Sequence, residues 1–220
     1  YDVTAINREK GTFTVTHNGV DEEYKIVNDN IINIYNSCAV ISVLHTFGLD
    51  YEKIHNAFET VKIVSSRFDI KKVGDYTIIG QLAKGQNPVA CAMAYRYVAS
   101  YKTADPEAKK SVLVLVDDVG DNSGNSESTC WLYDCDYSAL CSPTIGQTVF
   151  SGPRCLDHKL RALMAGVDEA KIVTCPTFTG GVKLVDTEKY KDIFVLFDPY
   201  LIAEGNAAKR YLEEKGGAAK

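Results

Sequence analysis

The sequence lacks the features that mark several large classes of protein. No cluster of lysine and arginine stands out among 24 basic and 29 acidic residues, and the formal net charge is −5. Since nucleic-acid-binding proteins carry a basic patch, we do not expect a nucleic acid as partner. No apolar run approaches the roughly 18 residues that cross a bilayer, and no basic segment followed by an apolar one opens the chain. We therefore expect no transmembrane segment, and no targeting signal is visible.

Cysteine is present, but without the pattern of a disulfide framework. Seven cysteines are an odd number, spread through a chain long enough to fold on its core alone. Reduced thiols in a cytoplasmic protein fit this pattern better than the disulfides of a small secreted domain. Cys130, Cys135 and Cys141 form the only local cluster, and their spacing does not match the close pairs of zinc sites. We expect no metal there.

Several catalytic motifs are also missing. The chain has no G-x-x-x-x-G-K-[ST] loop and no G-x-G-x-x-G turn, so it lacks the usual backbone nests for a triphosphate or a dinucleotide. It has no G-x-S-x-G elbow, and its four histidines form no pair at metal-ligand spacing. The chain is therefore not a complete P-loop enzyme, and nothing in it marks a self-contained nucleophile and base.

The first part of the chain predicts a hairpin followed by two helices. Residues 12–16 and 23–27 alternate at period two around an Asn18-Gly19 turn signal. Apolar residues then recur at helical spacing over 33–47, Gly48 suits the end of that helix, and Asp50 suits the start of a second helix over 51–61. A hairpin and two helices make a weak independent core, so we expect residue 1 to lie within a larger domain.

The rest of the chain predicts an α/β fold with a mostly parallel sheet. After Arg67, candidate strands alternate with helices, which is the order that places helices on the faces of such a sheet. The expected strands are 76–79, 112–116, 148–150, 171–174 and 193–197, and the expected helices are 88–101, 154–165 and 207–215. Residues 120–128 contain no apolar side chain and follow a strand, so we expect an exposed loop at the edge where such sheets bind ligands.

Polar residues at helix starts and strand ends are the candidates for a site. Asn33 and Asn36 lie at positions i and i+3 of a helix start, where their amides either read a purine edge or cap the helix. Arg67 and Lys84 flank the first strand of the α/β region and are able to neutralise phosphate.

Four carboxylates gather around the predicted polar loop. They belong to Asp117 and Asp118, at the end of an apolar strand, and to Asp134 and Asp136, which follow residues 130–133 (CWLY). Paired carboxylates at such an edge bind Mg²⁺ or orient a histidine. Each of the four taken alone is more typical of an exposed loop than of a site.

Several segments together resemble one branch of the Mur ligase family. Residues 33–39 (NIYNSCA) followed by Arg67 look like the end of the central ATPase domain, although Ser66 stands where the family has glycine. Residues 82–88 (LAKGQNP), 131–134 (WLYD), 151–161 (SGPRCLDHKLR) and 165–167 (AGV) are similar to K-N-P, W-x-W-D and S-G-x-R-x-x-D-x-x-x-R-x-x-x-A-G-V patterns of the MurT branch. The resemblance covers nearly the whole chain in order.

The resemblance implies both a fold and a function. Residues 1–66 would be the end of the central ATPase domain, and residues 67–220 a Rossmann-like C-terminal domain. The complete enzyme would be an ATP-dependent carbon–nitrogen ligase with glutamine as amide donor. With ATP and Mg²⁺ it would activate the D-glutamate α-carboxyl of lipid II, and ammonia from the partner GatD would convert it to D-isoglutamine in peptidoglycan synthesis. This chain alone, without a P-loop, would be inactive.

The resemblance also implies roles for particular residues. GatD resembles an amidotransferase that has the Cys and His of a triad but lacks the acid, and the MurT C-terminal domain is expected to dock GatD and supply that acid. The W-x-W-D match assigns this role to Asp134, with Asp136 as the alternative. Contacts to ATP are implied for Asn33, Asn36, Arg67 and Lys84, and contacts to substrate or partner for Asn87, Trp131, Arg154 and Asp157.

Two departures from the family patterns leave other functions open. Ser128 stands where the family's D-x-S-W has its first Asp, and K-N-P is stretched over residues 84–88. One alternative is the C-terminal substrate domain of another Mur or folylpolyglutamate-type amide ligase. The other is an interaction domain without a catalytic role. Copurification with a glutaminase subunit would favour the MurT function over the first alternative. An effect of Asp134→Asn on that glutaminase would separate a catalytic role from plain docking.

Overall fold

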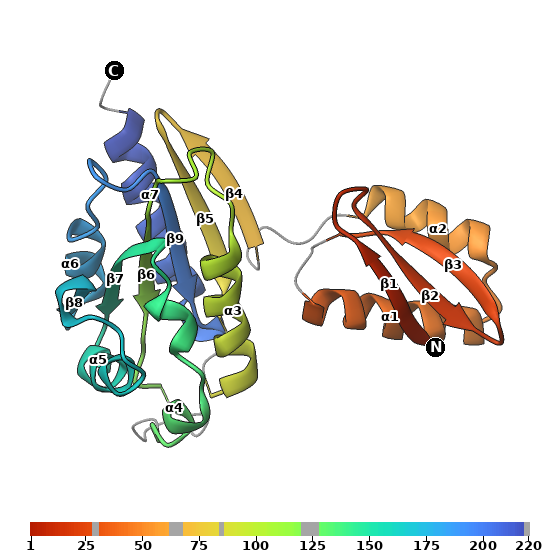
Figure 1. The fold of residues 1–220 in the computed structure, drawn as a ribbon, viewed down its shortest axis with the longest axis horizontal. Helices are drawn as coiled ribbons and strands as arrows, with labels where there is room; N and C mark the ends of the chain where they lie inside the picture. Colours follow the sequence, from red (N-terminus) through yellow and green to blue (C-terminus); the bar gives the residue numbers. More distant parts are fainter. Residues whose placement is uncertain (28–30, 62–67, 84–85, 120–127, 218–220) are drawn as a thin grey trace. The chain divides into compact units, whose positions relative to one another are not determined.

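The computed structural model describes residues 1–27, 31–61, 68–83, 86–119 and 128–217 (Figure 1). The chain forms two compact units, Tyr1–Val64 and Ser65–Lys220, which are called the first and second unit below. Arg67, Lys84 and most of the predicted polar loop 120–128 lie outside the described residues.

The first unit contains a three-stranded antiparallel sheet in the order β1-β2-β3. Its strands are β1 (Asp2–Asn7), β2 (Thr12–His17) and β3 (Val20–Lys25). The predicted hairpin is confirmed, and Asn18 and Gly19 both adopt the positive φ that a tight two-residue turn requires, 49° and 76°. Sequence analysis missed β1, because most of its residues are exposed and it lacks a clear apolar alternation.

Two predicted helices cover one face of this sheet. They are α1 (Ile31–Thr46) and α2 (Tyr51–Thr60), and their apolar side chains bury Phe13 and Tyr24 of the sheet. Gly48 ends α1 with a φ of +83°, and the Leu49 N–H donates to the Leu44 carbonyl across it. Asp50 caps α2, as predicted, by accepting a hydrogen bond from the Lys53 N–H.

The second unit is built on a six-stranded sheet in the order β4-β5-β9-β6-β7-β8. Only the edge strand β4 runs antiparallel to its neighbour, which confirms the predicted mostly parallel sheet. The strands are β4 (Phe68–Val73), β5 (Tyr76–Leu82), β6 (Lys110–Leu115), β7 (Ile145–Ser151), β8 (Ile172–Cys175) and β9 (Asp192–Phe197).

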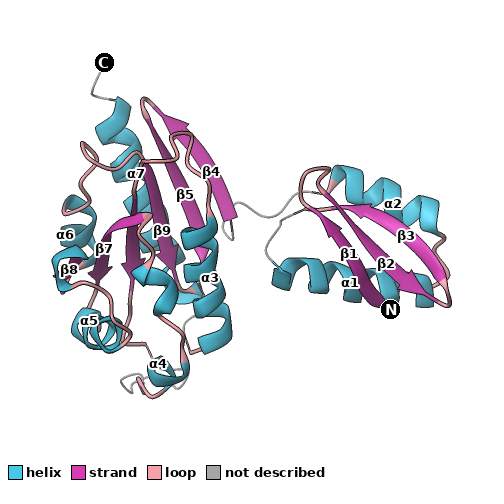
Figure 2. Cartoon of the chain, viewed as in Figure 1, coloured by secondary structure: helices cyan, strands magenta, loops and turns pink. Residues whose placement is uncertain are grey.

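Helices cover both faces of this sheet (Figure 2). One core contains side chains of α3 (Pro88–Ser100), α4 (Trp131–Asp134) and α5 (Cys155–Met164). The opposite core contains side chains of α6 (Phe178–Lys183) and α7 (Ile202–Gly217). Strands β6 and β9 are buried along their whole length, since they lie in the middle of the sheet between both layers.

The order of the strands creates a switch point at the carboxyl edge of the sheet. The chain runs from β5 through α3 to β6 and on to β7 and β8, and then returns to place β9 between β5 and β6. The helix that follows β5 packs in one core and the helix that follows β9 packs in the other. Ligand sites of open α/β sheets form at such a point, because the connections diverge there.

Candidate functional site

A small cavity lies at this switch point. Its lining includes Ala83 after β5, Asp117 after β6 and Asp198 after β9. Trp131 of α4 and His158 of α5 complete its polar side. The cavity volume is about 30 Å³, which is enough to hold water.

His158 lines the cavity as a neutral imidazole. Its Nδ1 lies 2.8 Å from the buried Tyr137 hydroxyl, and the Trp131 ring packs edge-on against it at 5.9 Å between centroids. Burial, and then the positive charge of Arg154, lower the pKa of His158 to about 3. The ring is therefore uncharged near neutral pH. Sequence analysis found no catalytic or metal-binding motif around His158 and did not foresee its place at the switch point.

Arg154 joins the end of β6 to the start of α5. Its guanidinium donates to the Thr129 hydroxyl at 3.1 Å, and it forms ion pairs with Asp118 at 3.4 Å and Asp157 at 2.9 Å. Arg154 and Asp157, both predicted to contact substrate or partner, are thus brought together with Asp118. A guanidinium held by several partners has little freedom to move, so this group fixes the carboxyl edge beside the cavity.

The two candidate triad carboxylates have different surroundings. Asp136 accepts a hydrogen bond from the Ser138 N–H at 2.9 Å and pairs with Arg96 at 2.8 Å. The hydrogen bonds from Ser138 and then from Arg96 lower its pKa to about 2. Asp134, at the end of α4, is exposed, and its carboxylate has no hydrogen-bond or ion-pair partner within the part of the chain that the structure describes.

Asn87 is engaged by its own helix. Its side-chain oxygen accepts a hydrogen bond from the Ala90 N–H at 2.9 Å, and Pro88 occupies the first position of α3. This is a standard N-cap, in which the side chain satisfies an amide that the helix leaves unpaired.

Asn33 and Asn36 both lie in the first half of α1, in the first unit. The helix begins at Ile31, so neither residue occupies its N-cap position. The Asn33 carbonyl accepts a hydrogen bond from the Ser37 hydroxyl at 2.9 Å, and Asn36 is exposed. Their spacing of three residues keeps both side chains near one face of the helix.

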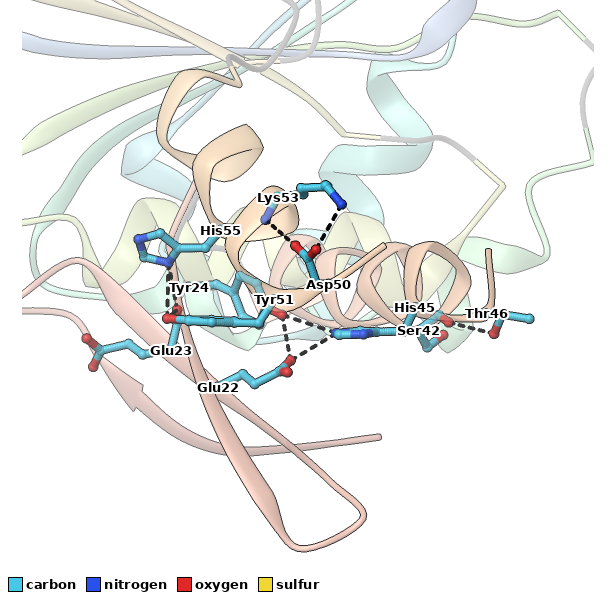
Figure 3. Close-up of polar contacts among 10 residues, drawn as sticks. All are labelled: Glu22, Glu23, Tyr24, Ser42, His45, Thr46, Asp50, Tyr51, Lys53 and His55. Carbon is cyan, nitrogen blue, oxygen red and sulfur yellow. Dashed lines mark hydrogen bonds and ion pairs between the residues drawn. The ribbon is translucent and has the colours of Figure 1, made fainter. Parts of the chain in front are cut away.

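The first unit contains a polar cluster that sequence analysis missed (Figure 3). The buried Glu22 carboxylate accepts a hydrogen bond from the Tyr24 hydroxyl at 2.6 Å and lies 3.0 Å from His45 Nε2. Burial, and then the bond to Glu22, raise the pKa of Tyr24. The available signal was the alternation of β3, which points Glu22 and Tyr24 to the same face.

Replacing Tyr24 by phenylalanine is expected to destabilise the first unit. The change removes the donor to a buried carboxylate, and a hydrogen bond to a charged group contributes about 2 kcal/mol. Amide hydrogen exchange of β2 and β3 reports on this unit alone, and it should become faster by more than tenfold. In the matched variant Tyr35→Phe, which removes the hydroxyl of an exposed residue of α1, exchange should be unchanged. Equal exchange in both variants would contradict a stabilising role for the cluster.

Two further properties concern the described residues as a whole. They contain no group of three or more His, Cys, Asp or Glu side chains placed to hold a metal ion. They also contain no helix that is both long and apolar enough to cross a membrane.

Comparison with known proteins identifies relatives of this chain. A family model described as MurT ligase C-terminal matches residues 84–200. The MurT subunit of lipid II isoglutaminyl synthase (glutamine-hydrolysing) from Staphylococcus aureus strain COL is 28% identical over 180 residues, which are 82% of this chain and 38% of that protein. The subunit of the same name from Streptococcus pneumoniae R6 is 24% identical over 175 residues, 80% of this chain and 37% of that protein. The chain thus spans less than two fifths of these relatives.

Solved structures of Mur ligases share the fold. MurF from Acinetobacter baumannii matches 92% of this chain and 42% of its own, with a TM-score of 0.66 and 16% identity. The UDP-N-acetylmuramate–alanine ligase MurC from Thermotoga maritima matches 96% of this chain and 44% of its own, with a TM-score of 0.63 and 17% identity. At these identities the likeness concerns the fold alone, and it confirms the predicted Mur ligase type of α/β domain.

Proposed function

The chain belongs to the MurT ligase C-terminal family, and we propose that it is the part of a peptidoglycan ligase that receives a glutamine-hydrolysing subunit. The complete enzyme would use ATP to activate the D-glutamate α-carboxyl of lipid II, and ammonia from GatD would convert it to D-isoglutamine in the cytoplasm. A carboxylate must become electrophilic before ammonia attacks it, and ammonia must be released close by. The names of the relatives, which are subunits of a glutamine-hydrolysing synthase, support this division of labour.

An exposed apolar row on α5 supports a docking surface for that subunit. Leu156, Leu160 and Met164 follow each other at intervals of four residues, which places them along one side of the helix. Their exposed fractions are 67%, 52% and 62%. Contiguous apolar side chains that remain in water are typical of a protein interface. This row is the observation that carries the proposal.

The short helix α4 extends this surface with the proposed catalytic carboxylate. The Arg161 side chain of α5 donates to the carbonyls of Leu132 and Cys135 and so fixes α4 against α5. Tyr133 and Asp134 of α4 are exposed. We assign Asp134 to the missing acid of the GatD triad, since Asp136 is already held by Arg96 and Ser138.

ATP and Mg²⁺ belong to the complete enzyme in this proposal. Asn36 fits contact with a purine, because it is exposed on α1. We assign Asn33 to the same contact, and Arg67 and Lys84 to the ATP phosphates. The residues that would hold Mg²⁺ are left unassigned in this proposal. ATP would supply the phosphoryl group that activates the substrate carboxyl.

Replacing Leu160 by glutamate is expected to abolish docking. A charge in the middle of an apolar contact remains desolvated without a partner, and hot-spot residues of interfaces contribute about 2 kcal/mol or more. We expect the Kd for a purified GatD-type subunit, measured by titration calorimetry, to rise at least about 30-fold. Leu184→Glu is the matched control, since Leu184 is also exposed but follows α6 on the opposite layer. If both variants bind like the original chain, α5 is not the docking surface.

A further inference from the structure

Arg161 connects the two parts of the surface that the proposed function uses. It lies in α5, whose apolar row is the proposed docking surface, and its side chain reaches the end of α4, which carries Asp134. It is also the last arginine of the S-G-x-R-x-x-D-x-x-x-R pattern over residues 151–161. Its contacts therefore bear on where the Asp134 carboxylate lies.

The guanidinium of Arg161 binds the backbone on both sides of Asp134. Its Nε donates to the Leu132 carbonyl at 2.9 Å, and its Nη2 donates to the Cys135 carbonyl at 2.8 Å. Carbonyls at the end of a short helix lack most of the partners that a longer helix provides. Because both donors belong to one rigid planar group, they fix the two carbonyls relative to each other and so fix the backbone between them.

The guanidinium is itself held in place. Its central carbon lies 5.2 Å from the centroid of the Tyr137 ring. Tyr137 is fully buried, and its hydroxyl lies 2.8 Å from Nδ1 of His158, about one turn before Arg161 on α5. Two charge-assisted hydrogen bonds and a cation–π contact leave the side chain of Arg161 little freedom to move.

Burial separates the anchors of α4 from the side chains that it presents. Leu132 and Cys135 are buried, whereas Tyr133 and Asp134 between them are exposed. A helix of one turn is not stable by itself. The direction in which Asp134 points therefore depends on the anchors at either side, and Arg161 binds both of them.

We propose that Arg161 is a positioning residue for glutamine hydrolysis, which places the Asp134 carboxylate for the histidine of the partner's triad. This inference rests on the proposed function, in which Asp134 completes that triad. Arg161 touches neither glutamine nor the histidine and acts through the backbone of α4. Accurate placement matters, because a displacement of about 1 Å in an active site lowers the rate about 10²-fold.

Arg161→Met tests the first step in the full chain without a partner. Methionine keeps the apolar stem of the side chain but removes its charge and its donors. The Cys135 N–H closes α4 by donating to the Trp131 carbonyl, and its exchange with solvent should become at least about tenfold faster. Lys159→Met is the matched control, since Lys159 flanks the apolar row of α5 on the other side and pairs with Glu169. It should leave this exchange unchanged.

Glutaminase kinetics test the second step. A purified GatD-type subunit is saturated with the full chain, and we expect Arg161→Met to lower kcat for glutamine about 10- to 100-fold. The KM for glutamine and the Kd of the two subunits should change less than about threefold, because the apolar row of α5 stays intact. If Arg161 only supported docking or folding, excess folded chain would restore kcat. Arg161→Lys keeps the charge without the paired donors, so its kcat should lie between the two.

The double variant with Asp134→Asn and Arg161→Met separates positioning from general damage. If Arg161 acts through Asp134, the double variant should turn over at about the rate of Asp134→Asn alone, because the carboxylate to be placed is already gone. Losses that multiply would overturn the proposal, and so would full kcat with the folded Arg161→Met chain. If that chain does not fold, Arg161→Lys takes its place in the same comparison.

The same measurements distinguish this inference from the proposed function. If Asp134→Asn lowers turnover and the folded Arg161 variant does not, the proposed function stands and only the role of Arg161 is lost. Normal turnover with Asp134→Asn would overturn the assignment of the acid and the role of Arg161 together.

Discussion

Glutamine hydrolysis by a GatD-type subunit is expected to fall by two to four orders of magnitude when the bound chain carries Asp134→Asn instead of Asp134. In a Cys-His-acid or Ser-His-acid triad, the acid holds the histidine in the correct tautomer and stabilises its cation. An asparagine in that place retains the shape but reverses the hydrogen-bonding pattern, and in serine proteases this change lowers kcat about 10⁴-fold. The measurement is glutaminase turnover of the purified partner with excess chain.

Asp134 suits this role because the described part of the chain leaves its carboxylate free. It is exposed at the end of α4, where a histidine from another subunit is able to approach it. Its neighbour Asp136 would first have to give up Arg96 and the Ser138 N–H. Desolvating a carboxylate that is already paired costs more than completing the pairing of one that is not.

The control for this experiment is Asp136→Asn, which should leave turnover within about twofold. Binding is measured beside activity, because a variant that no longer docks is inactive for a different reason. Normal stimulation by a bound Asp134→Asn chain would show that Asp134 is the wrong residue. The same substitution at Asp136, Asp118 and Asp117 would then identify which carboxylate of this edge acts, and activity in all four would leave docking as the only role of the chain.

The sequence predicted the elements whose pattern is local. The hairpin β2–β3, the helices α1, α2, α3 and α5, and the five parallel strands all carry a clear period or a cap in their own residues. The edge strands β1 and β4 were missed, because edge strands are exposed on several sides and lose the alternation that marks a half-buried strand. The helix α6 was missed because it contains Gly180 and Gly181, which are poor helix formers.

The site was less predictable, since its contacts join distant parts of the chain. The four aspartates around the predicted polar loop looked alike in sequence. In the structure, Asp136 pairs with Arg96, forty residues away, and Asp118 pairs with Arg154, thirty-six residues away. Asp198 was not considered at all, although it follows a wholly buried strand. Which carboxylate is paired, free or inside a cavity depends on the strand order, and no local pattern encodes the return of β9 to the middle of the sheet.

Replacing Gly152 by alanine is expected to unfold the second unit or to lower its melting temperature by about 10 °C. Gly152 follows β7 with a φ of +124°, a conformation that residues with a side chain rarely adopt. A Cβ at this position would overlap the Val116 carbonyl oxygen and press against the Phe178 ring. The unfavourable φ and the steric overlap together cost about 3 kcal/mol or more, which is a large part of a domain's total free energy of unfolding.

The backbone around Gly152 cannot relax cheaply, because it joins three strand ends. The Gly152 N–H donates to the Cys175 carbonyl at the end of β8, and the Ser151 carbonyl accepts from the Val116 N–H beyond β6, both at 2.8 Å.

Gly166→Ala is the matched control. Gly166 has a φ of +90°, but no atom lies within 4 Å of the position that its Cβ would take. This variant therefore isolates the backbone cost of about 1 kcal/mol. Thermal unfolding of the two variants measures the difference. If both variants lose the same few degrees of melting temperature, the crowding at Gly152 is unimportant. If only Gly152→Ala unfolds or loses about 10 °C, the glycine of the S-G-x-R pattern has a physical cause. This glycine lets the chain turn sharply after β7, so that Arg154 reaches Asp118 beside the cavity.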